Sequence, residues 1–197
     1  MLETLTRGLY SFVLRLLTPV YLARLWWKGR DEPVYRKRLG ERLGKYKLPP
    51  RRGRGGVVWV HAVSLGETKA AGPLIKALRT ELPEMRLLLT CSTATGVQAG
   101  LELLERQDDQ AWLPYDTPGA VRRFLFRYRP AVGIVMETEV WPNLVAAAAQ
   151  TFRPNPKLDT AKVITELSKG EALVSFLEGN GIPAMVDVAK STPDGYT

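Results

Sequence analysis

The sequence predicts an α/β fold in which helices cover both faces of a parallel sheet. From residue 56 onward, short apolar runs alternate with segments whose apolar residues recur at helical spacing. The runs are continuously apolar, as in strands that are buried on both faces of a sheet. An apolar helix interrupted by arginines precedes them, and a tail with signals for a helix and a hairpin follows. These observations place one sheet domain between two smaller segments.

The first predicted element is a helix over residues 1–27 with one narrow polar stripe. Arg7, Ser11, Arg15 and Thr18 recur at helical spacing on a surface that is otherwise apolar. A membrane-spanning helix rarely carries arginines near its middle, and the segment lacks the cleavage site of a secretory signal. We therefore expect a helix that lies in the membrane interface. The alternative is an ordinary buried helix that caps the domain.

Basic and aromatic residues of this helix and of the residues just after it would contact the membrane surface. Arginine side chains reach lipid headgroups while their stems lie along apolar surface, and tryptophans favour the boundary between lipid and water. The residues that we expect to contact the membrane or its anionic lipids are Arg15, Arg24, Trp26, Trp27, Lys28 and Arg30.

The next segment, residues 28–54, is strongly basic. It holds eleven Lys/Arg and three Asp/Glu, a balance of +8 that equals the formal net charge of the whole chain. Such a segment needs an anionic partner or a well-solvated surface, and nucleic acid, anionic lipid and a phosphorylated substrate all qualify by charge. Only Tyr35 and Tyr46 could stack on bases, so we expect no nucleic acid.

Residues 55–148 form the predicted sheet domain, with strands and helices in alternation. The strands are expected at 57–62, 86–91, 111–113 and 131–136. The first helix presents apolar residues such as Ala71 and Ile75 on one face. The later helices are expected to end near residue 106, to span 118–128 and to begin at Trp141 and Pro142.

Chemically capable residues follow the strands at the edge where parallel sheets bind ligands. Glu67 follows the first strand near a helix N-terminus, where the helix dipole favours a carboxylate that can act as a general base. Glu137 and Glu139 follow the fourth strand and face the same crevice if the first and fourth strands are neighbours. Turns at the ends of the first two strands offer N–H groups to a phosphate. The expected substrate-binding residues are Ser64, Gly66, Ser92, Thr93, Glu137 and Glu139.

The same residues also have purely structural interpretations. Glu67 could cap the helix that follows it, and Glu139 could be a solvated loop charge. His61 is more typical of a packing or hydrogen-bonding residue than of a catalyst, and Cys91 is most simply the end of a buried strand. One histidine and one cysteine cannot form a disulfide framework or a His/Cys metal cluster, so we expect no metal and no cofactor.

Several motifs resemble one known family. They are H-x-V-S-x-G-E at residues 61–67, the segment 90–96, L-P-Y-D at 113–116 and E-x-E-x-W-P-N at 137–143, together with the first helix and residues 40–44. In this order they resemble the N-terminal domain of the 3-deoxy-D-manno-octulosonic acid (Kdo) transferases. The resemblance covers about 145 residues.

The resemblance implies a Rossmann-like half of a two-domain GT-B glycosyltransferase. Such an enzyme moves Kdo from CMP-Kdo to a lipid A precursor, lipid IVA, in lipopolysaccharide biosynthesis, with inversion and without a metal. It works as a peripheral or monotopic protein on the cytoplasmic face of the cell inner membrane. The family's proposed base falls on Glu67, and Glu137 matches another functionally important glutamate. The basic segment would suit the phosphates of the acceptor.

The tail, residues 149–197, departs from this family. From about residue 147 the chain resembles the C-terminal region of bacterial HerA-type helicase-like ATPases, although no P-loop occurs. We therefore expect a composite chain that lacks the donor-binding domain of a transferase. Within the tail a helix is expected at 160–167, and a hairpin that pairs 172–177 with 184–188.

Three functions follow from these observations. The first is a Kdo transferase by descent that retains its binding of acceptor and membrane. The second is a non-catalytic module on the membrane surface that binds phosphorylated lipid. Nucleic-acid binding is the third, and the composition of the basic segment argues against it.

Overall fold

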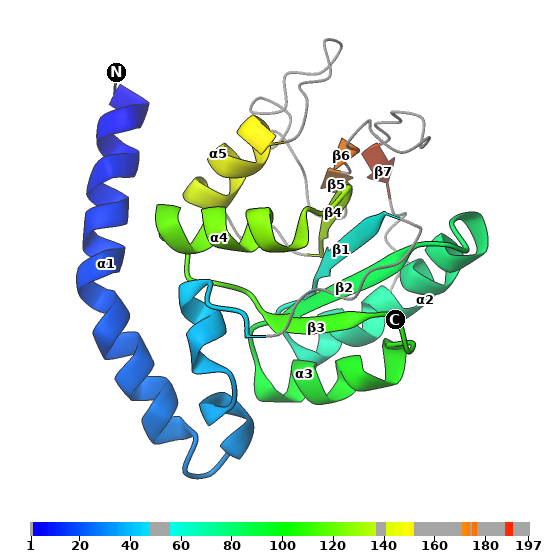
Figure 1. The fold of residues 1–197 in the computed structure, drawn as a ribbon, viewed down its shortest axis with the longest axis horizontal. Coiled ribbons are helices and arrows are strands. Elements are labelled where there is room, and N and C mark those ends of the chain that lie inside the picture. The colour runs from blue at the N-terminus through cyan, green and yellow to red at the C-terminus, as the bar shows by residue number, and fades with distance from the viewer. Residues whose placement is uncertain are drawn as a thin grey trace, which may run out of the picture.

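Parallel strands form the centre of the structure. The computed structural model describes residues 2–47, 56–136, 141–151, 171–173, 175–176 and 188–190. The parallel strands are β1 (Val57–His61), β2 (Arg86–Cys91), β3 (Asp109–Trp112) and β4 (Val132–Val135), in the order β3-β2-β1-β4 (Figure 1). β1 pairs with both β2 and β4. The predicted α/β fold with a parallel sheet is confirmed, and the first and fourth strands are neighbours.

Apolar side chains from the sheet form two layers of core. On one face Val60 and Leu89 pack with Ala71 and Ile75 of helix α2 (Leu65–Glu81). On the other face Trp59 and Leu88 pack with residues of α4 (Pro118–Tyr128) and α5 (Pro142–Thr151). Because successive strand residues point to opposite faces, the continuous apolar runs supply both layers.

The helix after β2 is shorter than predicted. α3 spans Ala94–Gly100, and a 3₁₀ turn, η3, follows at Leu101–Leu103. The chain then turns so that the buried carboxylate of Asp108 accepts the N–H groups of Leu87 (2.8 Å) and Glu105 (2.7 Å) and pairs with Arg79 (2.6 Å). A helix continued to residue 106 would forgo these bonds, which satisfy the loop's backbone.

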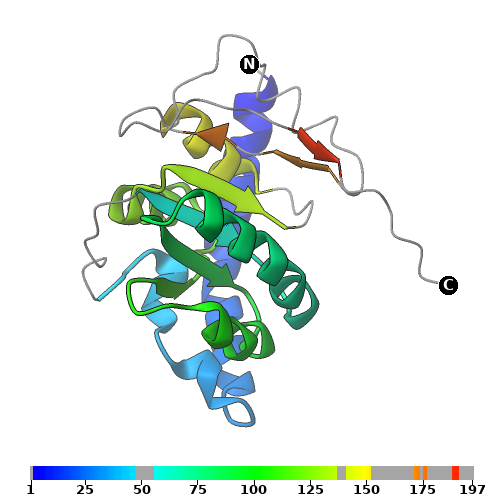
Figure 2. The same cartoon turned by 90° about the vertical axis from the view of Figure 1, so that its right-hand side faces the viewer.

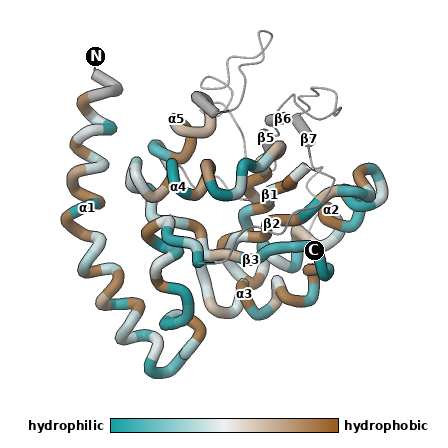
Figure 3. Tube along the Cα trace, viewed as in Figure 1, coloured by the Kyte–Doolittle hydropathy of each residue, from teal (hydrophilic) through white to brown (hydrophobic). Residues whose placement is uncertain are grey.

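Helix α1 (Leu2–Lys28) runs along one side of the domain (Figures 1 and 2). Its polar stripe faces the protein, since Ser11 is buried whereas Leu9, Phe12 and Leu16 are about 60% exposed or more. Apolar residues recur along its length (Figure 3). None of the helices in the described part of the chain is both long enough and apolar enough to span a membrane.

The basic segment is partly folded into the domain. Two 3₁₀ turns, η1 (Pro33–Arg36) and η2 (Leu39–Leu43), lie between the end of α1 and β3 (Figure 1). Glu41 and Arg42 are buried, so solvation of the whole segment, one of the two alternatives for its charge, does not hold at these residues. Residues 48–54 lie outside the described residues.

The tail contributes short strands. β5 (Glu171–Leu173) pairs antiparallel with β7 (Val188–Lys190), whereas β6 (Ser175–Phe176) joins the edge of the central sheet, antiparallel to β4. The predicted hairpin is therefore wrong for residues 175–176, which pair with β4 instead. The predicted helix at 160–167 lies outside the described residues. The divisions at 1–27, 28–54, 55–148 and 149–197 stay predictions.

Candidate functional site

The carboxyl ends of β1 and β2 bring most of the predicted site residues together. The carbonyl oxygen of Val63 accepts the N–H groups of both Ser92 and Thr93, each at 3.1 Å. At Gly96, an added Cβ would lie 3.2 Å from the carbonyl carbon of Ser64. The first turns of α2 and α3 are therefore in contact, and Ser64, Gly66, Glu67, Ser92 and Thr93 share one edge of the sheet.

The Glu67 carboxylate is fixed at the start of α2 by two hydrogen bonds. The Ser64 hydroxyl donates to Oε1 at 2.7 Å, and the N–H of Val63 donates to Oε2 at 2.6 Å. Glu67 is half-buried. The bonds tie Glu67 back to the loop before α2, although neither satisfies a backbone N–H of the helix as the predicted cap would. They also hold its carboxylate at the ligand-binding edge, where a general base would have to lie.

The turn after β2 uses its polar groups locally. The Thr93 hydroxyl oxygen accepts the N–H of Gly96 at 3.1 Å and so caps α3. The N–H groups of Ser92 and Thr93 are engaged by Val63, so a phosphate would have to replace or share those bonds. The carbonyl of Ser92 accepts a hydrogen bond from the Arg42 guanidinium at 2.9 Å.

Arg42 is a residue of this edge that the sequence analysis did not single out. It is 5% exposed, its guanidinium lies 4.2 Å from the Trp112 ring centre, and it also donates to the carbonyl of Leu113 at 3.3 Å. Burial lowers its pKa from the usual value. Arg42 thus ties the segment at 40–44 to the ends of β2 and β3. Only its place in that motif could have drawn attention to it.

His61 and Cys91 have the structural roles predicted for them. His61 Nδ1 lies 3.0 Å from the Thr90 carbonyl oxygen and 2.9 Å from its hydroxyl, and burial lowers the pKa of His61 to about 4. The other ring nitrogen, Nε2, is buried and has no partner among the described residues. Burial raises the pKa of the Cys91 thiol to about 11. The part of the chain that the structure describes holds no cluster of three His, Cys, Asp or Glu that could bind a metal.

Asp116 and Asn143, from two of the motifs, join α5 to α1. Asp116 accepts the N–H groups of Asn143 at 2.9 Å and Leu144 at 2.8 Å, and thereby caps α5. The Asn143 side chain is hydrogen-bonded to the Ser11 hydroxyl at 3.0 Å. Burial raises the pKa of Asp116. These roles depend on contacts between distant segments, so spacing along the sequence could not have revealed them.

Comparison with known proteins decides the family. Residues 37–154 match the family described as 3-deoxy-D-manno-octulosonic-acid transferase (kdotransferase), which is more than half of the chain. This chain belongs to the Kdo transferase family. A second match, at residues 138–195, is to the helicase HerA-like C-terminal family, in agreement with the composite chain expected.

Several curated Kdo transferases are similar to the chain. The 3-deoxy-D-manno-octulosonic acid transferase of Bordetella pertussis is 47% identical over 159 residues, which are 72% of this chain and 34% of that protein. The Haemophilus influenzae enzyme is 34% identical over 142 residues, 71% of this chain and 32% of that protein. A probable mitochondrial enzyme of Arabidopsis thaliana is 32% identical over 140 residues, 70% of this chain and 30% of that protein.

The chain therefore spans about a third of the length of these Kdo transferases. No solved structure matches it.

The E-x-E-x-W-P-N motif of this Kdo transferase family member follows β4. His61 pairs with Val135 across β1 and β4, and the N–H of Met136 donates to the carbonyl of His61 at 2.9 Å. β4 thus ends at the same edge as β1. Glu137 and Glu139 themselves lie outside the described residues, and their roles stay predictions.

The residues predicted to contact membrane lie on α1 and just after it. Trp26 and Trp27 are 56% and 66% exposed, and Arg36 and Arg30 lie over their rings at 4.6 and 5.2 Å. Lys28 pairs with Glu32 at 3.4 Å, and Arg15 and Arg24 are exposed. All six predicted residues are near the surface, and their contact with a membrane stays a prediction.

Proposed function

We propose that this chain forms the acceptor side of a Kdo transferase that moves Kdo from CMP-Kdo to lipid IVA in lipopolysaccharide biosynthesis. Glu67 is the general base: it removes the proton of the acceptor hydroxyl as that oxygen attacks the anomeric carbon of Kdo, and cytidine monophosphate leaves. The reaction inverts the anomeric configuration and uses no metal. The observation that carries this proposal is the placement of Glu67 at the carboxyl edge of β1.

The hydrogen bonds of Glu67 support this role. A base must present its carboxylate in one orientation to the reacting hydroxyl, and the bonds from Ser64 and Val63 restrict that orientation. We assign the binding of the acceptor to Ser64, Gly66, Ser92 and Thr93 at this edge. Glu137 and Glu139, which follow the neighbouring strand, complete the proposed site.

Donor binding belongs to a different part of the enzyme in this proposal. In a GT-B transferase the second domain holds the nucleotide, and this chain covers about a third of the length of its relatives. We place the protein at the cytoplasmic face of the inner membrane as a peripheral or monotopic protein. The exposed apolar side chains of α1 and the basic residues that follow it support this location.

The test is transfer of Kdo from CMP-Kdo to lipid IVA by the whole chain and by Glu67→Gln, each supplied with the part of the Bordetella pertussis enzyme that this chain does not cover, which provides donor binding. The substitution keeps the size of the side chain but removes the base, so turnover should fall by about 10²- to 10⁴-fold while lipid IVA still binds. Glu81→Gln is the matched control, because Glu81 is exposed at the other end of α2. Undiminished transfer by Glu67→Gln, in a variant with unchanged melting temperature, would contradict the proposal.

A second candidate function is a non-catalytic module that binds phosphorylated lipid at the membrane surface. The observation that favours it is α1, which presents exposed apolar residues outward and its polar stripe to the protein. The same assay separates the candidates. A chain that binds lipid IVA but transfers no Kdo, even when donor binding is supplied in this way, supports the second one.

A further inference from the structure

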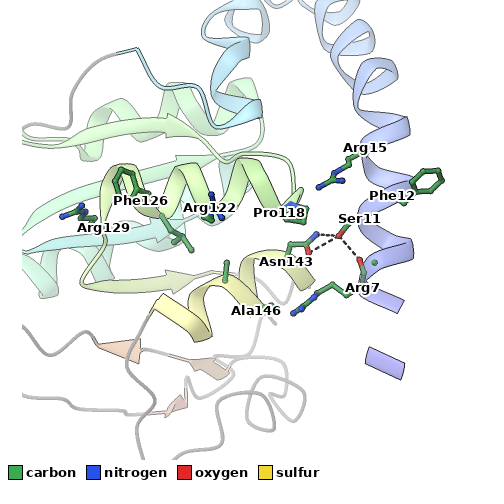
Figure 4. Close-up of a pocket in the computed structure, with 13 residues that line it drawn as sticks. Arg7, Ser11, Phe12, Arg15, Pro118, Arg122, Phe126, Arg129, Asn143 and Ala146 are labelled. Atoms are coloured by element: carbon green, nitrogen blue, oxygen red, sulfur yellow. Dashed lines mark hydrogen bonds between the residues drawn. The ribbon is translucent and has the colours of Figure 1, made fainter. Parts of the chain in front are cut away.

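A groove of about 920 Å³ lies between α1, α4 and α5 (Figure 4). Its walls combine apolar side chains with four arginines: Arg7 and Arg15 from α1, Arg122 from α4 and Arg129 directly after α4. Among the described residues that line it, none is acidic. The groove is separate from the edge at Glu67, since the described residues of that site (Ser64, Gly66, Glu67, Ser92 and Thr93) do not line it.

The contact between Ser11 and Asn143 lies at the groove and joins two of its walls. This bond fixes α1 against the first turn of α5, and Arg7 and Arg15 lie one turn to either side of Ser11. Figure 4 shows both arginines extending from α1 toward α4 and α5, whereas Phe12 points to the outer side of the helix. The basic wall is therefore built by the same contact that anchors α1.

The rest of the groove is apolar and roomy. Leu125 is buried, Phe126 is 72% exposed, and Ala146 adds only a small side chain. At Gly8 an added Cβ would have no atom within 4 Å. An apolar chain could lie here against side chains that are otherwise left in water, and its burial would be favourable.

The four arginines give the groove a positive charge. Within the described residues, no ion pair joins a carboxylate to Arg7, Arg15, Arg122 or Arg129. Arg129 instead lies over the Phe126 ring at 5.0 Å. Guanidinium groups with free donors bind phosphate well. A polyanion such as nucleic acid would leave the apolar surface unused, so a ligand with both a phosphate and an acyl chain fits better.

We propose that this groove binds one anionic phospholipid of the bilayer, with its phosphate among the arginines and an acyl chain along Leu125, Phe126 and Ala146. The proposal rests on the interfacial placement of α1 in the proposed function, because the groove lies beside the exposed apolar face of that helix. A bound lipid would contact α1, α4 and α5 together, and so would add to the Ser11–Asn143 bond that joins α1 to the domain.

Native mass spectrometry of the detergent-solubilised chain with phosphatidylglycerol tests the apolar part of the groove. One lipid should remain bound to the wild type, and phosphatidylcholine should bind much less. Ala146→Trp fills the groove without changing charge and should abolish the adduct. Ala77→Trp, at an exposed position of α2, is the control and should keep it. An adduct that survives Ala146→Trp would overturn the proposal.

A charge variant tests the arginines independently of the groove's volume. Arg15→Gln with Arg122→Gln should weaken phosphatidylglycerol binding roughly 25-fold, about fivefold for each charge lost near the headgroup. Lys76→Gln with Arg106→Gln removes the same charge at exposed positions elsewhere and should change little. Equal effects of the two pairs would mean nonspecific attraction and would overturn the site.

Two competitors identify the source of the bound phosphate. Inorganic phosphate at the lipid's concentration should not displace phosphatidylglycerol, because it gains nothing from the apolar wall. Displacement by lipid IVA at equal concentration would assign the groove to the acceptor and would overturn the proposal that it binds a phospholipid. Glu67→Gln should keep the adduct, so failure of the proposed transfer reaction and failure of this site are distinguishable.

Discussion

Glu67 combines a structural and a proposed chemical role in one side chain. Its two hydrogen bonds, from Ser64 and Val63, connect the loop after β1 to the first turn of α2. The same bonds point the carboxylate at the edge of the sheet where ligands bind in this class of fold. A structural role in joining the loop to α2 and a catalytic role are therefore compatible, and only a substitution that is assayed for both stability and transfer separates them.

Arg42 should be among the most sensitive residues for stability. Arg42→Ala removes the hydrogen bonds to Ser92 and Leu113 and the contact with the Trp112 ring, all in a buried setting. Buried carbonyls left without their charged donor destabilise the fold, so the free energy of unfolding should fall by about 3 kcal/mol. Urea denaturation followed by circular dichroism measures it.

Lys45→Ala is the control for Arg42→Ala, because Lys45 is an exposed basic residue of the same segment. Its unfolding free energy should stay within about 0.5 kcal/mol of the wild type. If Arg42→Ala were equally mild, the buried guanidinium would contribute little to the fold.

His61 should make stability depend on pH. Burial lowers its pKa from 6.5 to about 4 in the fold. Between these values the unfolded chain binds a proton that the folded chain does not, so the contribution is present above pH 6.5 and is lost as pH falls toward 4. The unfolding free energy should drop by up to about 1.4 kcal/mol per pH unit in this window. Urea titrations at several pH values measure it.

His61→Gln isolates this effect from other titrating groups. Glu67 and Arg42 also act electrostatically on His61, and they remain in the variant. Burial raises the pKa of Glu41 and Asp116. Carboxyls of this kind make the fold more stable as pH falls, which is opposite to the effect of His61, and they are present in both proteins. Above pH 6.5 the unfolding free energies of wild type and variant should therefore change with pH at the same rate. Below pH 6.5 only the wild type should show the additional loss that His61 causes. An identical slope in both proteins down to pH 4.5 would show that His61 does not contribute.

At the scale of elements, α1 carries the surface that we expect to bind membrane. Leu16 and Val20 are 62% and 64% exposed on its outer side. Leu16→Asp with Val20→Asp should reduce binding to anionic vesicles at least about tenfold, because apolar area that would enter the interface is lost. Co-sedimentation with vesicles measures it, and deletion of residues 1–27 should abolish binding.

The stability of the folded chain should be unchanged in the Leu16 and Val20 variant, because both side chains are exposed. Leu101→Asp is the control: Leu101 is 51% exposed but belongs to η3, far along the chain from α1. If it reduced vesicle binding as much as the α1 variant, or if the deletion of 1–27 left binding intact, the assignment of α1 would be wrong.

The elements differ in how far the sequence could predict them. The strands and α4 follow from local pattern, since the apolar run at Arg86–Cys91 and the helical segment at Pro118–Tyr128 have the predicted bounds. The end of α3 does not follow from local pattern, because it is determined by the buried carboxylate of Asp108, whose partners belong to other elements. The polar stripe of α1 was visible in the sequence, but its orientation toward Asn143 was not.

The candidate site could be predicted only where local pattern determines it. Glu67 and its neighbours at Ser64 and Thr93 lie in loops directly after strands, so the pattern of strands locates them. Arg42 comes from a segment without regular periodicity, and its burial results from contacts with β2 and β3. Long-range contacts of this kind have no signature in a single sequence.

At the scale of the whole molecule, matches to two families overlap in one chain. The match to the Kdo transferases ends at residue 154 and the match to the HerA-like C-terminal family begins at 138, so the two overlap on α5. In the structure the part of the tail at Ser175–Phe176 extends the transferase sheet beside β4. The proposed acceptor site lies at the carboxyl ends of β1 and β2, around Glu67.

Hydrogen exchange of the whole chain with and without lipid IVA tests the proposed acceptor site most directly. Bound acceptor should slow exchange of the amides at 62–68 and 91–96, which lie at the carboxyl edge of β1 and β2. Exchange in the middle of α2 should not change. Protection at both edge segments would support the acceptor site proposed around Glu67. Protection confined to the groove between α1, α4 and α5, with none at the edge, would contradict it.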